Sequence, residues 1–159
     1  MKMIILRGLP GASKTTFVKN EFAPEMERLN KRWAHISAGH YFEDKGEYKF
    51  DHTKLGKAHG EAFLAAVEAQ TALPQVDYII IDNTSSTKWE ISPYIALANA
   101  YLDEHLVLEF PCDVETSISR NIHGVPRAAI ENMAKRWENP LKQWNHCLFD
   151  KETWKEKVL

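Results

Sequence analysis

An eight-residue segment near the start of the sequence, GLPGASKT at positions 8–15, has side chains and spacing suited to binding phosphate. Gly8 and Gly11 let backbone N–H groups turn inward around an anion. The ammonium of Lys14 can reach the outer phosphates of a nucleotide, and the hydroxyl of Thr15 can bind magnesium. Because the segment stands between an apolar strand pattern and a helical pattern, it predicts a phosphate-binding P-loop for ATP. The residues expected to bind the nucleotide are Gly8, Gly11, Ala12, Ser13, Lys14, Thr15 and Thr16.

One position of this segment departs from the usual pattern GxxxxGK[ST]. Ser13 stands where the last glycine is usual. A small residue fits there if its φ angle is negative. The alternative to a P-loop is a turn rich in Gly and Pro that precedes Lys and Thr by chance.

A carboxylate follows the most apolar run of the chain, YIII at 78–81. A buried parallel strand there would deliver Asp82 beside the P-loop, where it could hold magnesium or a water bound to magnesium. Thr15 and Asp82 are therefore the predicted metal ligands. The alternative is an aspartate that starts a turn together with Asn83.

Strand and helix patterns alternate along the chain, as they do in parallel sheets with helices on both faces. Apolar runs typical of strands lie at 2–6, 33–37, 78–81 and 105–110. Helical patterns lie at 14–22, 51–74, 90–102, 113–121 (with Asp113 as the cap) and 126–138. Pro24 is expected to break the first helix, after which residues 24–32 can form a further turn or two. Ligands of such sheets bind at the carboxyl ends of the strands. Residues 39–50 have no regular period and are interpreted as a functional loop, and residues 139–159 are left unplaced.

Length and composition limit the possible architecture. A chain of 159 residues with 44% hydrophobic residues can bury one substantial core, so we expect one domain over 1–159. The net charge of -2 excludes the strong basic excess that would by itself hold a protein on nucleic acid, but leaves room for a local basic groove. Cys112 and Cys147 form no CxxC pair and are expected to be reduced thiols. No apolar stretch approaches the ~20 residues of a membrane span, so a cytoplasmic protein without membrane contact is expected.

Four blocks of sequence resemble a known family, the small P-loop kinases related to phage polynucleotide 5′-kinase and to the kinase-like domains of ubiquitin-ligase-binding proteins. The blocks are GLPGASKTT, then SAGHYF with GEYKFD and LGKAH, then IIIDNTSSTKWEISPY, and finally RNIHGVPRAAIENMAKRWE, over about residues 3–138. The resemblance implies a three-layer α/β/α P-loop kinase fold with a central parallel sheet and a helical lid at about 113–138. It also implies ATP and Mg²⁺ as cofactors, and transfer of the γ-phosphate to a hydroxyl of a nucleic acid or nucleotide, including a modified base in DNA.

The same resemblance assigns roles to individual residues. It makes Lys14 and Thr15 the residues for ATP and magnesium, and it places Asp82, Asn83 and Thr84 at the wall near the acceptor. It makes Arg120 and Arg127 lid residues, which would stabilise the charge that builds up on the transferred group. The predicted catalytic residues are Lys14, Asp82, Arg120 and Arg127. For Arg127 the alternative is a solvated residue in the first turn of the last helix.

The chain departs from this family at position 39. Related sequences tend to carry an acidic residue there, which accepts the proton of the attacking hydroxyl, whereas this chain has Gly39. His40, Asp44 or Asp82 could take over that role, and for His40 the alternative is an ordinary exposed histidine of the loop. The departures at Ser13 and Gly39 motivate a rival interpretation, a nucleotide-binding pseudokinase without transferase activity. A second rival is an ATP-driven switch that acts on a partner protein.

Aromatic residues surround the same position. Tyr41, Phe42, Tyr48 and Phe50 alternate with Lys45 and Lys49, a combination that can stack a base and hold a phosphate, or that can pack the loop onto its own domain. Trp89 and Tyr94 are expected to pack their helix onto the sheet. His52 and His59 lie seven residues apart on one helical face, but without a third ligand they do not predict a metal site.

Overall fold

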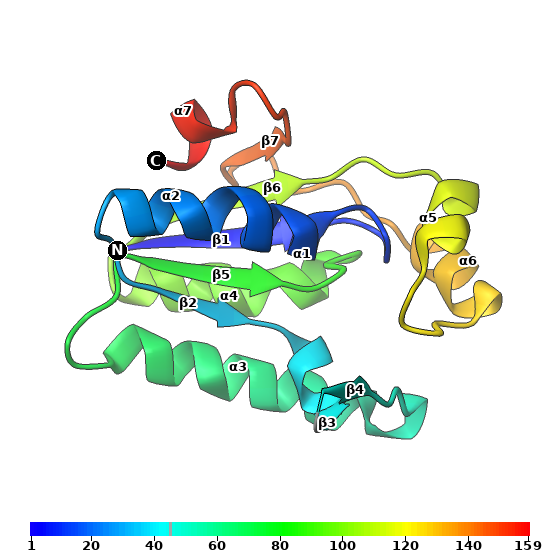
Figure 1. Ribbon diagram of the computed structural model, residues 1–159. Helices are drawn as coiled ribbons and strands as arrows, with labels where there is room; N and C mark the ends of the chain where they lie inside the picture. The colour runs from blue at the N-terminus through cyan, green and yellow to red at the C-terminus, as the bar shows by residue number, and fades with distance from the viewer. Residues whose placement is uncertain (45) are drawn as a thin grey trace.

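The centre of the molecule is a parallel sheet, in a computed structural model that describes residues 1–44 and 46–159 (Figure 1). The strands lie in the order β2-β5-β1-β6-β7. Their bounds are Trp33–Ile36 for β2, Tyr78–Asp82 for β5, Lys2–Arg7 for β1, Glu104–Glu109 for β6 and His146–Leu148 for β7. Each neighbouring pair is parallel, with Ile4 opposite Ile80 on one side and Leu106 on the other. The apolar runs of the sequence thus form a buried parallel sheet, as predicted.

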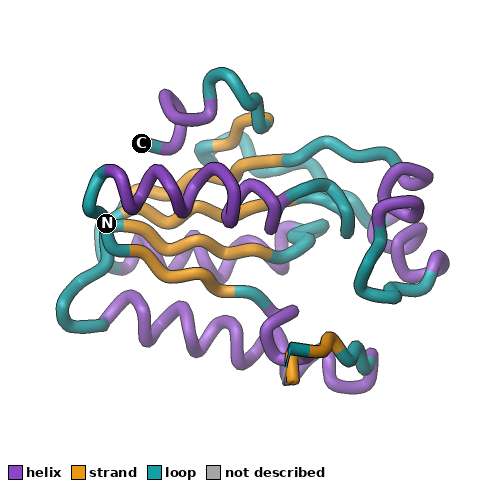
Figure 2. The backbone as a smooth tube through the Cα atoms, in the orientation of Figure 1, coloured by secondary structure: helices purple, strands orange, loops and turns teal. Residues whose placement is uncertain are grey.

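Helices cover both faces of this sheet, which confirms the predicted three-layer α/β/α fold (Figures 1 and 2). Alternate residues of β1 point to opposite faces, so Met3 and Ile5 enter one core while Ile4 and Leu6 enter the other. The first core packs against α3 (Leu55–Thr71) and α4 (Lys88–Ala100), and the second packs against α1 (Lys14–Phe17) and α2 (Ala23–Arg28). The short helices α5 (Val114–Arg120) and α6 (Arg127–Lys135) lie beyond the carboxyl ends of the strands (Figure 1).

The helix after the P-loop continues past Pro24, so the expected break there is wrong. A π-helical turn at Val18–Phe22 joins α1 to α2, and Pro24 lies in the first turn of α2. Proline has no N–H to donate and crowds the carbonyl of the preceding turn. The wider π-helical turn directly before Pro24 accommodates this loss, and the chain remains helical through Arg28.

Residues 38–50, expected to form an irregular loop, contain regular structure. A 3₁₀ turn spans Ala38–Phe42, and a short hairpin follows with β3 (Glu43–Asp44) and β4 (Glu47–Tyr48). The buried ring of Phe42 lies 5.2 Å from the ring of Phe50 and 6.0 Å from that of Tyr48. These rings therefore pack the segment onto its own domain. Lys45 and the side chain of Asp44 lie outside the described residues.

The carboxyl-terminal segment, which the sequence pattern left unplaced, completes the second core. β7 extends the sheet beside β6, and α7 (Trp154–Val158) returns to the side of the sheet that α2 covers. Trp154 is fully buried, with its ring 5.1 Å from that of Phe17 in an edge-on contact. Among the described residues, no helix has the length and apolar character needed to cross a membrane.

Candidate active site

The P-loop follows β1, and the side chain of its lysine, Lys14, contacts backbone carbonyl groups of the same loop. The ammonium of Lys14 donates hydrogen bonds to the carbonyl oxygens of Gly8 at 2.6 Å and Leu9 at 3.2 Å. Burial lowers the pKa of Lys14, and the charge of the nearby Asp82 partly opposes this effect. The loop thus fixes a cation at the positive end of the following helix, the arrangement that binds a phosphate chain.

Ser13 has a left-handed backbone, so the condition of a negative φ is not met. Its φ is 74° and its ψ is 19°, values that favour glycine. The turn into α1 requires this conformation whatever residue occupies the position. A serine there costs about 1–2 kcal/mol relative to its preferred conformations, and the P-loop keeps its shape despite this strain.

Helix α5 packs directly against the P-loop, and this contact brings Arg120 to the phosphate site. Gly11 has a φ of +77°, and a Cβ atom at this position would lie 2.9 Å from Cβ of Arg120. The buried hydroxyl of Ser117 donates to the carbonyl oxygen of Pro10 at 2.5 Å. Asp113 caps the amino end of α5 by accepting from the N–H of Thr116 at 2.8 Å, as the sequence predicts.

The carboxyl end of β5 brings oxygen ligands next to the P-loop. Oδ2 of Asp82 accepts a hydrogen bond from the Thr15 hydroxyl at 2.8 Å and lies 3.0 Å from Nε2 of His35. Burial alone would raise the pKa of Asp82, but the hydrogen bond from His35, the charge of Lys14 and the hydrogen bond from Thr15 together lower it. Asp82 is therefore an anion at neutral pH.

This pair of oxygens fits magnesium. Mg²⁺ in phosphate-transfer sites is usually held by one or two protein oxygens together with water and substrate phosphates. Thr15 and Asp82 supply one hydroxyl and one carboxylate oxygen beside the phosphate loop. His35 was not predicted as a site residue, because it lies 47 positions from Asp82 in the sequence and meets it through the pairing of β2 with β5.

The residue after Asp82 anchors the segment that carries Gly39. The side-chain oxygen of Asn83 accepts a hydrogen bond from the N–H of Ala38 at 2.8 Å. Ser37 caps the same turn by accepting from the N–H of Gly39 at 3.1 Å. The acceptor wall expected at residues 82–84 is thus tied to the turn at Ala38–Phe42.

One cleft of about 1380 Å³ runs from the P-loop to the aromatic segment, by which we mean residues 41–50. Its floor includes Lys14, Thr15 and Thr16 of the P-loop together with Asp82, Asn83 and Thr84. Its far end lies between α3, α4 and the segment that joins α5 to α6. The lining residues there include His40, Phe42, Tyr48, Phe50, His59, Phe63, Trp89, Glu90, Tyr94, Ile122, His123 and Arg136.

The predicted lid arginines differ in their surroundings. Arg120 lines the cleft beside Gly11. Arg127 lies at the surface, where its guanidinium donates to Glu131 at 2.8 Å and to Glu115 at 2.5 Å. A third arginine from the same region, Arg136, lines the cleft at the end of α6.

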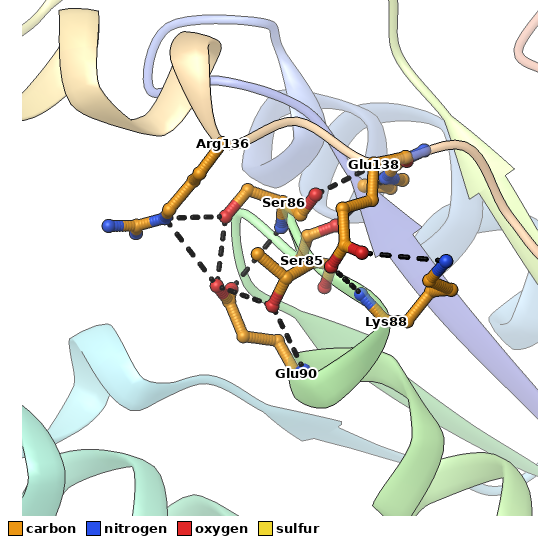
Figure 3. A network of polar contacts seen from close by, with 8 residues as sticks. Ser85, Ser86, Lys88, Glu90, Arg136 and Glu138 are labelled. Atoms are coloured by element: carbon orange, nitrogen blue, oxygen red, sulfur yellow. Dashed lines mark hydrogen bonds and ion pairs between the residues drawn. The ribbon is translucent and has the colours of Figure 1, made fainter.

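The contacts of Arg136 show how the segment after α6 is attached (Figure 3). Its guanidinium donates to the hydroxyl of Ser86 at 3.1 Å and lies 3.9 Å from the carboxylate of Glu90. Glu138 accepts from the N–H of Lys88 at 3.0 Å and pairs with the ammonium of Lys88 at 3.5 Å. These contacts join the segment after α6 to the start of α4.

A buried arginine at the end of β1, Arg7, also contacts the segment before α4. Its guanidinium donates to the carbonyl oxygens of Ser85 and Ser86 at 2.8 and 3.0 Å, and pairs with Glu109 at 3.2 Å. It also lies 4.2 Å from the centre of the Trp137 ring. A charged residue at the end of an apolar strand is the sequence signal that could have found Arg7, because a buried arginine needs several partners.

Trp89 is exposed, so the expectation that it packs α4 onto the sheet is wrong. Its side chain is 86% exposed, whereas Tyr94 is buried as expected and packs edge-on against Phe63 at 5.6 Å. Trp89 lies in the first turn of α4 and borders the cleft. Ile122, 87% exposed, borders it as well.

Comparison with known proteins identifies the family of this chain. Residues 3–145 match the model of the AAA_33 family, described as an AAA domain. NEDD4-binding protein 2 of Homo sapiens is 31% identical over 140 residues, which make up 86% of this chain and 8% of the relative. The chain thus spans a small part of that protein's length.

Solved structures share the fold at lower identity. Kti12 of Chaetomium thermophilum, in complex with ADP-AlF3, superposes with a TM-score of 0.70 at 22% identity over 98% of this chain and 94% of that chain. The APS kinase CysC of Mycobacterium tuberculosis, in complex with AMPPNP and APS, gives a TM-score of 0.65 at 10% identity over 99% and 95%. This chain therefore belongs to the AAA_33 family of AAA domains and has the fold of the P-loop kinases, as the sequence predicts.

Proposed function

We propose that this protein transfers the γ-phosphate of ATP to a hydroxyl group of a nucleic acid or nucleotide. The observation that carries the proposal is the continuous cleft between the P-loop and the aromatic segment. Sites for one small ligand usually measure about 300–1000 Å³, so a cleft of about 1380 Å³ has room for two substrates. ATP would occupy the P-loop end and the acceptor the aromatic end.

The lining of the acceptor end supports a nucleobase as part of the acceptor. The exposed ring of Trp89 borders the cleft, and aromatic side chains stack on bases of any sequence. Solved structures with the same fold include the APS kinase in complex with APS and a deoxyadenosine kinase of M. mycoides with bound dATP. Those proteins bind nucleotides as acceptor or ligand, and the proposal extends that class to this chain.

Each predicted residue has a role in the transfer. The backbone of residues 8–16 and the ammonium of Lys14 hold the phosphate chain in line with the acceptor. Thr15 and Asp82 would hold Mg²⁺, which when bound neutralises charge between the β- and γ-phosphates. Arg120 stabilises the negative charge that grows on the transferred group, because α5 holds it against the P-loop. Arg127 would take part once the lid closes further over ATP.

A screen of acceptors with γ-labelled ATP tests the proposal. The acceptors are oligonucleotides with DNA or RNA 5′-hydroxyl ends, free nucleosides, and DNA with a hydroxylated base. Label that moves to one of these acceptors, with wild type but not with Lys14→Ala, supports the kinase. Tight binding of MgATP without transfer to any acceptor would support the pseudokinase instead, and ATP hydrolysis stimulated by a protein partner would support the switch.

A further inference from the structure

We infer that His40 is the general base of this protein, accepting the proton of the acceptor hydroxyl in place of the carboxylate that Gly39 lacks. The inference rests on the proposed kinase function and names a catalytic residue for it. It starts from the position of His40, which follows Gly39 directly and lines the cleft beside it.

The turn that carries His40 is fixed at both ends. At its start, Ser37 caps the turn and Asn83 holds the N–H of Ala38. At its end, Phe42 is buried in the core. A general base must be held within hydrogen-bond reach of the proton that it removes, and a rigid short turn meets this requirement better than a loose loop.

The imidazole of His40 packs on a second histidine. Its ring centre lies 4.8 Å from that of His35, with the planes nearly perpendicular at 86°. Nε2 of His35 donates to Asp82, because a carboxylate can only accept. Oδ2 of Asp82 thus contacts both His35 and Thr15, and the proposed function assigns this carboxylate to magnesium, which leaves His40 as the better placed of the two candidate bases whose side chains the structure describes.

Both histidines also border a second cavity of about 260 Å³, which is lined by residues of β2, α3 and the turn at Ala38–Phe42 and by none of the P-loop. Its other polar lining groups are Ser37, Tyr41 and Glu61. A polar cavity of this size has room for several water molecules. His40 therefore borders both the cleft and this side cavity. A proton that His40 accepts in the cleft can then pass to water in the side cavity, and its path does not lead back past the substrate.

The protonation state of His40 suits this role near neutral pH. Burial lowers the pKa of His40 below its ordinary value of 6.5, and His35 lowers it further. Glu43 and Asp82 oppose this shift, and Lys19 adds to it. The ring is therefore neutral at pH 7 and can accept a proton.

The step balances as an ordinary phosphoryl transfer. The O–H bond of the acceptor breaks, and its proton moves to a ring nitrogen of His40. The oxygen bonds to the γ-phosphorus while the bond from that phosphorus to the bridging oxygen breaks, which releases ADP. The imidazolium then gives its proton to water in the side cavity.

The test compares His40→Gln with His52→Gln, a substitution of an exposed histidine that does not line the cleft, in transfer from γ-labelled ATP to a 5′-hydroxyl oligonucleotide. Loss of a positioned base lowers kcat by roughly 10²- to 10⁴-fold and leaves ATP affinity within about twofold. Wild type and His52→Gln should lose activity as the pH falls through the pKa of His40, and His40→Gln should lack this dependence. Imidazole in solution should restore part of the activity of His40→Ala, which a purely structural loss would not allow.

The outcomes separate this inference from the proposed function. Transfer by wild type to no acceptor would overturn both. Transfer by wild type with an unchanged kcat and pH profile in His40→Gln would leave the kinase standing and overturn the role of His40. If His40→Gln does not fold, as judged by circular dichroism, the imidazole response of His40→Ala decides between the same two results.

Discussion

The two ends of the cleft are built in different ways. At the P-loop end, Lys14 and Asp82 are buried and their polar atoms are held by partners at 2.6–3.2 Å. At the acceptor end, Trp89 and Ile122 are more than 80% exposed. This difference indicates that the phosphate site is preorganised. The proposed acceptor site instead has exposed apolar side chains that a bound molecule would cover. Changes at the first end should therefore affect turnover, and changes at the second should affect acceptor binding.

The largest effect is expected from Lys14→Ala. The substitution removes the cation that holds the outer phosphates, and alanine is a good helix residue, so the fold should persist. We expect turnover to fall by on the order of 10³-fold or more. Circular dichroism with an ATP titration and a transfer assay measures this, and Lys142→Ala, at an exposed lysine, is the control. Unchanged turnover would refute the P-loop assignment and with it the contrast between the two ends.

The lid arginines allow a matched comparison on the same substrate. Arg120→Ala should lower kcat by about 10²-fold with a smaller effect on ATP binding, because charge on the transferred group grows toward the transition state. Arg127→Ala should cause a smaller loss, since its guanidinium is engaged by Glu115 and Glu131. Steady-state kinetics of both variants measure the difference. An effect of Arg120→Ala confined to the Michaelis constant for ATP would contradict the proposed role in the transition state.

At the acceptor end, Trp89→Ala should weaken acceptor binding. Stacking of a base on an aromatic ring is worth about 1–3 kcal/mol, so the Michaelis constant for an oligonucleotide should rise by about tenfold. The Michaelis constant for ATP should not change, because the ring lies at the other end of the cleft. Leu102→Ala, which removes another highly exposed side chain after the end of α4, is the control. Equal effects of the two variants would show that Trp89 has no role in the acceptor site.

The sequence allowed the P-loop end to be predicted because its features are local. The spacing of Gly8, Gly11 and Lys14, the apolar strand before them and the cap at Asp113 each depend on neighbouring residues. Asp82 was predicted from a local feature as well, because it directly follows the apolar run at 78–81. These features also specify the central strands, so the fold class followed from short-range patterns.

The acceptor end depends on contacts between residues far apart in sequence. The approach of Arg136 to Ser86 is set by the path of the segment after α6. At the P-loop end, the approach of His35 to Asp82 also joins distant residues, because it is set by the pairing of β2 with β5. The exposure of Trp89 could not be predicted either, because residue type indicates average burial and not the surroundings in one fold. The φ angle of Ser13 could not be predicted for a related reason, since the loop imposes a backbone conformation that serine does not favour.

The smallest expected change in rate concerns Gly39, where the resemblance to the small P-loop kinases implies an acidic residue. A Cβ atom at this position would lie 3.2 Å from the hydroxyl of Ser37 and 3.9 Å from the ring of Tyr48, so a side chain fits after a shift of a few tenths of an ångström. We expect Gly39→Asp to place a carboxylate near the acceptor and to raise the transfer rate several-fold without changing ATP affinity. Gly39→Asn has nearly the same shape without the charge, and should not raise the rate.

The effect of Gly39→Asp should depend on whether His40 is present. With His40 present, the new carboxylate supplements an existing base, and the gain should stay within several-fold. In His40→Gln the same carboxylate would be the principal base, so the gain should grow toward about 10²-fold. Kinetics of the two single variants and the double variant on a 5′-hydroxyl oligonucleotide measure this coupling. Fast transfer by wild type that Gly39→Asp and Gly39→Asn both destroy would show instead that glycine makes room for a bulky acceptor, because a loss independent of charge indicates a steric block.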